Sequence, residues 1–155
     1  MKIKFLIALC SVVSICVEVY ADGEQEVKRG GFPYMAFLYY PDESVVDGTG
    51  SRFLRGAILI RSDWLVTSAV GPSIVPGAPN GFPRKTLLAR LGAVVIDDHF
   101  TLNEDEDEQE REVVQIVRPY NNSATQWWRT DISLMKVLLP FNITSAVDTI
   151  TLDYK

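Results

Sequence analysis

Short apolar runs dominate the chain from residue 34 onward. They are rich in valine, isoleucine, leucine and aromatic residues and are bounded by turn residues, which is typical of β-strands. The pattern predicts six strands, over residues 34–40, 52–60, 64–69, 86–96, 112–118 and 131–139. No stretch of helical periodicity competes with them, so we expect an all-β sandwich or a closed barrel.

Two segments between these strands have compositions that favour loops. Residues 71–83 hold four of the eight prolines, which cannot donate to a sheet, so a long surface loop is predicted there. The acidic run over residues 104–112 predicts a solvated hairpin loop, because like charges this dense repel each other. Its carboxylates would also suit calcium, although the spacing of an EF-hand is lacking.

The N-terminal segment differs from the rest of the chain. Lys2 and Lys4 precede an almost purely apolar run, and Ala21 offers a small residue at a cleavage site. This pattern predicts a secretory signal peptide over residues 1–21, with Asp22 as the first mature residue. A membrane anchor is the alternative, but the apolar run is shorter than the roughly 20 residues that a spanning helix needs.

Export to the extracellular space changes what the cysteines and the charge imply. Cys10 and Cys16 both lie in the predicted signal peptide, so the mature chain would have no disulfide to support its core. Cleavage removes two lysines and one glutamate, which leaves 13 basic and 19 acidic residues and a net charge of −6. That balance argues against nucleic acid as a partner, because phosphate binding needs a basic patch. Asn121 and Asn142 begin two glycosylation sequons in predicted loops.

Five segments follow one another in an order that resembles the N-terminal half of the trypsin-like serine proteases. They read FPYMA at 32–36, RGAILIRSDWLVTSAV at 55–70, ARLG at 89–92, VQIVRPYN at 114–121 and TDISLMKV at 130–137. The family pattern reads F-P-x-x-V, C-G-G-S-L-I with W-V-L-T-A-A-H-C, V-x-x-G, H-P-x-Y and N-D-I-A-L-L-K-L. The resemblance implies a single six-stranded antiparallel Greek-key barrel over residues 22–155.

The residues that carry catalysis in this family are not preserved. The mechanism needs a serine nucleophile, a histidine that takes its proton and an aspartate that orients the histidine. Asp131 matches the aspartate, but Val70 stands at the histidine position and has no proton to exchange. The single histidine, His99, is expected to be an exposed loop residue. Asp131 would then either accept backbone N–H bonds near Ala69 and Val70 or be hydrated in an open site.

Other departures from the family agree with the loss of activity. Arg55 and Gly71 stand at the two cysteine positions whose disulfide ties the histidine loop in the family. The family's nucleophile belongs to a second barrel, which this chain is expected to lack. Ala93 stands where the family has a carboxylate of its calcium loop. The resemblance therefore implies no enzyme, no catalytic metal and no cofactor.

Because these departures argue against catalysis, we expect the chain to act by binding. Trp127, Trp128 and Arg129 lie on a loop that borders the substrate cleft in the family, so they are candidate interface anchors; alternatively the tryptophans fill the barrel mouth. In the family the inner face of this barrel packs against the second barrel, so we expect an apolar face that takes a protease, a protease cofactor or a second copy. We expect a secreted, non-catalytic protease homologue. The alternatives are a truncated product of a longer protease-like protein and a small secreted module that binds an ion or ligand.

Overall fold

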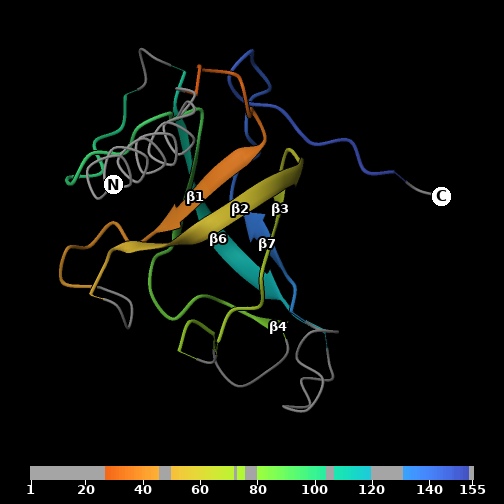
Figure 1. Ribbon diagram of the computed structural model, residues 1–155. Coiled ribbons are helices and arrows are strands. Elements are labelled where there is room, and N and C mark those ends of the chain that lie inside the picture. The colour runs from red at the N-terminus through yellow and green to blue at the C-terminus, as the bar shows by residue number, and fades with distance from the viewer. Residues whose placement is uncertain are drawn as a thin grey trace, which may run out of the picture.

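The computed structural model describes residues 27–45, 50–71, 73–75, 80–103, 107–119 and 131–153. Within these ranges every regular element is a β-strand, and no helix there is long and apolar enough to cross a membrane. Figure 1 shows the strands wrapped around one interior. They are β1 (Met35–Tyr39), β2 (Phe53–Arg61), β3 (Trp64–Thr67), β4 (Asn80–Gly81), β5 (Leu88–Leu91), β6 (Gln109–Val117) and β7 (Ser133–Val137).

The strand pairs are all antiparallel, and their order closes the sheet into a barrel. The order is β6-β5-β1-β2-β3-β7, and β6 also pairs with β7. Because β5 returns to lie beside β1, the order β5-β1-β2-β3 is that of a Greek key. The predicted six-stranded antiparallel Greek-key barrel is confirmed, and its closure pairs the strand edges that an open sheet would expose.

Side chains that point into the barrel form its core. On β1, Ala36 and Leu38 are 1% and 0% exposed while Met35 is 39% exposed, which is the alternation of a strand with one buried face. Leu59 of β2 and Met135 of β7 are fully buried in the same interior. The closed barrel thus fills its interior with its own side chains, and the expected partner face on its outside stays a prediction.

The strand predicted over residues 86–96 is shorter in the structure. β5 ends before Gly92, whose φ of 83° lies in the left-handed region, and a Cβ at this position would come within 2.5 Å of the Asp107 carbonyl oxygen. The apolar residues 94–96 that suggested a longer strand belong to a loop instead. This loop bends back over the outer face of β5, where the Thr101 carbonyl oxygen accepts a hydrogen bond from Arg90 at 2.8 Å.

Two segments predicted as loops contribute to the sheet. Asn80 and Gly81, from the proline-rich segment, form β4 and pair with Val117 and Ile116 of β6. β6 itself begins at Gln109, inside the acidic run and before the predicted start at residue 112. The prediction of a solvated loop is therefore wrong for the end of that run, where carboxylates take part in a strand.

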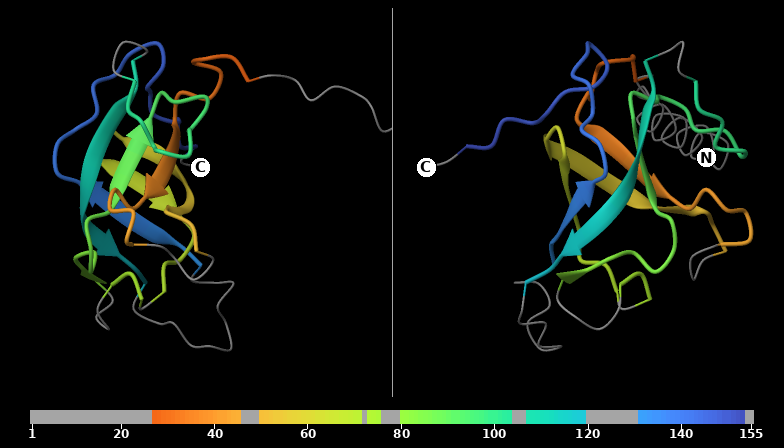
Figure 2. Two further views of the ribbon diagram at one scale, coloured as in Figure 1. Left: turned by 90° about the vertical axis from the view of Figure 1, so that its left-hand side faces the viewer. Right: turned by 180° about the vertical axis from the view of Figure 1, so that it is seen from behind.

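The segment after β7 closes one end of the barrel. The backbone N–H of Asp148 donates to the Pro33 carbonyl at 2.9 Å, and that of Ile150 donates to the Leu59 carbonyl at 3.0 Å. Val147 between them is fully buried. Figure 2 shows the chain then extending away from the barrel toward its C-terminal end.

Candidate functional site

The candidate site lies where β3 ends and the chain runs on beside β7. Thr67, the last residue of β3, pairs with Ser133, the first residue of β7. Three residues later the Val70 side chain is 2% exposed and packs in the hydrophobic core. A side chain so deeply buried is out of reach of a bound substrate. The valine therefore completes the core at the position where the resemblance implies a histidine.

The backbone N–H groups of this strand end have side-chain acceptors on the β7 side. The Ala69 N–H donates to Asp131 Oδ1 at 2.8 Å, and the Val70 N–H donates to Ser133 Oγ at 3.1 Å. Ser133 is fully buried, whereas the Asp131 residue is exposed. Both expectations for Asp131 hold in part, because its carboxylate accepts one backbone N–H and also faces solvent. The role of Ser133 was not anticipated from the sequence.

The carbonyl groups of the same strand end bind two guanidinium groups. Arg55 Nη1 donates to the Ala69 carbonyl at 3.0 Å, to Ser68 Oγ at 2.7 Å and to the Ser68 carbonyl at 3.4 Å. Arg118 Nη1 donates to the Val70 carbonyl at 3.2 Å. We call Arg55 and Arg118 the arginine clamp. Arg55 stands where the resemblance implies a cysteine of a disulfide. In this chain, hydrogen bonds from Arg55 to the strand end are found at that position instead.

The other implied cysteine position carries no such link. Gly71 is exposed, and a Cβ there would meet Ser73 Oγ at 3.8 Å, an ordinary contact distance. Arg55 is a charged residue among the apolar residues of strand β2, and that position was the signal in the sequence that could have marked it. Its partners could not be read from the sequence, because they depend on how β2 and the strand end meet in space.

Among the described residues, the polar groups at this strand end can hold the backbone in position, but they offer no group that takes a proton from a nucleophile. Asp131 accepts an amide hydrogen, which fixes backbone but activates no nucleophile. The one histidine of the chain, His99, is exposed, as predicted, and lines a different cavity beside β1 and β2. Within the described ranges, the strand end therefore holds an acceptor without a general base.

A buried ionic cluster on the outer face of the barrel was not foreseen from the sequence. Arg90 is 1% exposed, and its Nη2 donates to Glu110 Oε2 at 2.9 Å and to the Tyr39 hydroxyl at 2.7 Å. The Tyr39 hydroxyl in turn donates to Glu110. Burial, followed by the hydrogen bond to Glu110, raises the pKa of Tyr39 above its ordinary value. The cluster holds the loop after β5 against β1 and β6.

The same cluster bears on the calcium interpretation of the acidic run. Glu108 is 7% exposed; its Oε2 lies 3.9 Å from Arg90 Nη1 and accepts the Asn103 N–H at 2.9 Å. Glu110 also binds Arg90, so an internal cation already faces these two carboxylates. In the part of the chain that the structure describes, no group of three or more histidine, cysteine, aspartate or glutamate residues could hold a metal ion.

Several predicted site residues fall outside the described ranges. Trp127, Trp128, Arg129 and the sequon at Asn121 belong to these, as do the predicted signal peptide and residues 104–106 of the acidic run. Asn142 is described and exposed, and its backbone N–H donates to Gln109 Oε1 at 2.9 Å.

Comparisons with known proteins identify the family. The trypsin family model matches residues 21–155. Among solved structures, neuropsin, a serine protease expressed in the limbic system of mouse brain, matches with a TM-score of 0.55 and 22% identity. The match covers 83% of this chain but 47% of the neuropsin chain, so this chain spans about half the length of that protease. No curated protein matches. The chain, with its trypsin-like barrel and its trypsin match over residues 21–155, belongs to the trypsin family.

Proposed function

We propose that this chain is a non-catalytic member of the trypsin family that acts by binding another protein. The observation that carries the proposal is the buried valine at position 70, 2% exposed, where the family mechanism requires an ionisable base. The neighbouring Asp131 carboxylate is engaged by the Ala69 N–H at 2.8 Å and has no imidazole to orient. The strand end is thus built for packing and backbone hydrogen bonding.

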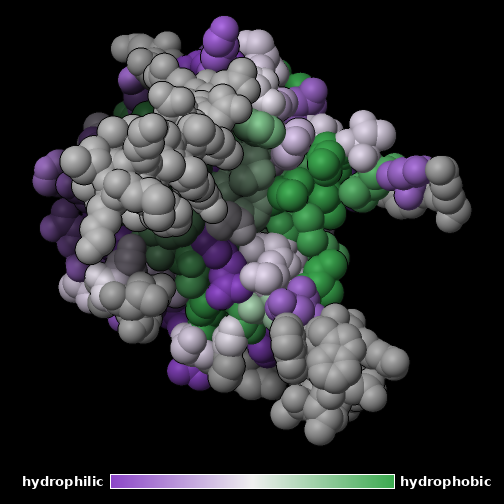
Figure 3. Space-filling view, in the orientation of Figure 1, coloured by the Kyte–Doolittle hydropathy of each residue, from purple (hydrophilic) through white to green (hydrophobic). Residues whose placement is uncertain are grey.

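An apolar area on the outer surface supports the binding role. Ile58 and Ile60 alternate with buried neighbours along β2 and are partly exposed, as is Val66 of β3. Leu138 and Leu139, just after β7, are 59% and 62% exposed. Figure 3 shows apolar residues gathered on the side of the molecule where β2 and β3 lie in Figure 1. Contiguous apolar surface of this kind is a common mark of protein contacts.

The partner that we propose is a protease, a protease cofactor or a second copy of this chain. Static and dynamic light scattering at micromolar concentration tests the last of these. Self-association predicts a mass of twice the protomer or more. A monodisperse monomer would leave a heterologous protein as the partner and would refute the second copy.

The absence of catalysis is tested directly. The purified chain, expressed in a secretory host, should neither hydrolyse fluorogenic peptide amides nor be labelled by a fluorophosphonate, because a base and an activated serine are both required for that chemistry. Trypsin at equal concentration is the positive control. Turnover that coelutes with the chain and is abolished by the fluorophosphonate would overturn the proposal.

We also propose that the chain is exported and glycosylated, on the basis of its N-terminal segment and its sequons. Intact-mass measurement of the secreted product should give Asp22 as the first residue. Peptide N-glycosidase should lower the mass if Asn121 or Asn142 carries a glycan, and Asn142→Gln removes the sequon that lies within the described ranges. A product that begins at Met1 and stays with the cells would contradict export.

A further inference from the structure

A cavity on the outer surface, away from the arginine clamp, has the lining of a ligand site. It measures about 690 Å3 and lies between β1, the start of β2 and the loop at residues 96–100. Phe37 and Phe53 form an aromatic wall, with ring centroids 6.4 Å apart at an interplanar angle of 61°. Phe53 is 39% exposed. We propose that this cavity, the Phe37–Phe53 cavity, binds a lysine or arginine side chain of a partner protein.

The charge balance of the lining favours a cation. The described residues around the cavity include three carboxylates, those of Glu43, Asp97 and Asp98, against one guanidinium, that of Arg52. Arg52 is itself committed to the wall. Its Nε donates to the Tyr40 carbonyl at 3.0 Å, its Nη2 donates to the Pro41 carbonyl at 2.9 Å, and its Nη1 lies 3.9 Å from Glu43.

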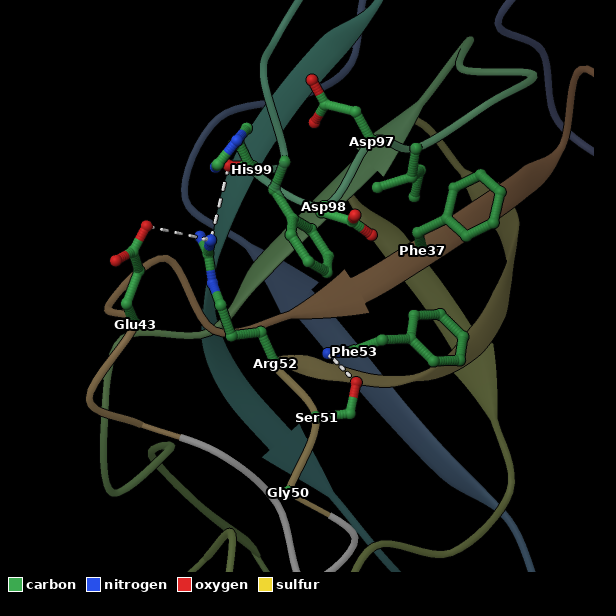
Figure 4. Close-up of a pocket in the computed structure, with 11 residues that line it drawn as sticks. Phe37, Glu43, Gly50, Ser51, Arg52, Phe53, Asp97, Asp98 and His99 are labelled. Carbon is green, nitrogen blue, oxygen red and sulfur yellow. Dashed lines mark hydrogen bonds and ion pairs between the residues drawn. The ribbon is translucent and has the colours of Figure 1, made fainter.

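The two aspartates of the loop have different roles. Asp97 Oδ1 accepts the Thr101 N–H at 2.8 Å, and this hydrogen bond lowers the pKa of Asp97 below its ordinary value. In Figure 4, Asp97 points away from the cavity while Asp98 points toward Phe37. A cation seated against the two rings would therefore lie next to the Asp98 carboxylate. An aromatic face beside a carboxylate is a favourable setting for an organic cation.

The loop that carries Asp98 is held in place before any ligand arrives. Phe100, with a φ of 57°, stacks on Tyr39 with ring centroids 4.7 Å apart, and the Arg52 guanidinium carbon lies 4.5 Å from the centroid of the Phe100 ring. This stack fixes the loop against β1. A preorganised wall lowers the entropy cost of binding.

Two further features favour a side chain of a protein over a free ion. In the described ranges, no group of three or more metal-ligating side chains is close enough to hold a metal. A second cavity, of about 190 Å3, shares Phe37 with the first and is also lined by Phe32, Met35 and Val94. A peptide that crosses Phe37 could place a basic side chain in the larger cavity and an apolar one in the smaller. The stem of lysine or arginine also packs well on aromatic rings.

This inference rests on the proposed binding role but is tested without any measurement of proteolysis. The probe is acetyl-Val-Ala-Lys-Ala amide, titrated into the 15N-labelled protein and followed by two-dimensional NMR. The backbone signals of Phe37, Phe53 and Asp98 should shift and saturate. The peptide with glutamine in place of lysine should bind about fivefold more weakly, and raising NaCl from 50 to 500 mM should weaken the lysine peptide.

Matched variants test the Asp98 carboxylate and the aromatic wall one at a time. Asp98→Asn removes one charge at constant shape and should weaken the lysine peptide about threefold to fivefold. Phe53→Ala should do the same by removing one ring. Glu112→Gln removes one charge from an exposed residue that lines neither cavity, and should leave the affinity unchanged. The spectrum of each free variant shows whether it is folded.

Three results would overturn the inference. The first is equal binding of the lysine and glutamine peptides, and the second is an affinity that Asp98→Asn and Glu112→Gln change alike. The third is the same set of shifted signals on addition of calcium chloride alone, which would make the cavity an ion site. Failure of the peptide to bind would refute the Phe37–Phe53 cavity, whereas the hydrolysis assay alone decides whether the chain is non-catalytic.

Discussion

Replacement of Arg55 by methionine tests whether the arginine clamp holds the strand end. Methionine keeps the apolar stem and removes the guanidinium, which donates to the Ala69 carbonyl at 3.0 Å and to Ser68 Oγ at 2.7 Å. The bond to Ala69 is partly buried and charge-assisted, so we assign it about 1.5 kcal/mol of stability, and the exposed bond to Ser68 about 0.5 kcal/mol. The methionine side chain loses less conformational entropy on folding than arginine does, which offsets about 0.5 kcal/mol of this loss. Arg55→Met should therefore lower the free energy of unfolding by about 1.5 kcal/mol.

Urea denaturation and thermal unfolding measure this loss. For a domain of this size, a change of about 1.5 kcal/mol lowers the Tm by about 6 °C. Ser68→Ala is the matched control, since it removes the exposed bond alone and should cost about 0.5 kcal/mol. Hydrogen exchange of the Ala69 and Val70 amides should also accelerate in Arg55→Met, because the clamp limits local opening. A variant within about 0.3 kcal/mol of the parent protein, with unchanged exchange, would refute the clamp as a stabilising feature.

Three further predictions follow from the same geometry. Val70→His should lower the free energy of unfolding by about 3 kcal/mol, because it buries an imidazole in the core at a position that is 2% exposed. The variant should not hydrolyse peptides, and a stability in urea equal to that of the parent protein would contradict the prediction. Asp131→Ala should cost about 1 kcal/mol and Asp131→Asn about half of that, because the amide oxygen can still accept the Ala69 N–H; equal losses in chemical denaturation would show that this bond is not the cause. The folded state raises the pKa of Tyr39 above the ordinary value of 10.0, so the stability it contributes is full below that pH and is lost as the pH rises beyond it. Tyr39→Phe should reduce the fall of Tm between pH 9 and 11.5, and an unchanged alkaline slope would contradict that assignment.

The barrel could be predicted from the sequence because its strands are short apolar runs bounded by turn residues, and because five segments resemble the trypsin-like pattern. The apolar run MAFLY of β1 is an example, since Ala36 and Leu38 point into the core and the final tyrosine is also buried. The end of β5 was missed because residues 94–96 are as apolar as a strand, and the turn at Gly92 depends on its close approach to the Asp107 backbone. Local composition carries no information about that contact.

The candidate site was predictable in position but not in contacts. The resemblance located Val70 and Asp131, and the strand end does bring their backbone and side chain together. The arginine clamp and the cluster around Arg90 were missed for a common reason. Arg55 and Arg90 each stand between apolar residues of a strand, which is a visible signal, but their partners lie on other segments of the chain. Pairing across such distances is decided by tertiary packing rather than by any local pattern.

The arginine clamp makes the strand end independent of redox conditions. A disulfide acts on the unfolded chain as well as the folded one, because it keeps two segments tethered after everything else has come apart. Hydrogen bonds from Arg55 to Ser68 and Ala69 exist while the barrel exists and vanish with it. They need no oxidant to form and are untouched by a reductant. The strand end can therefore form again each time the barrel refolds, and its durability is that of the surrounding barrel.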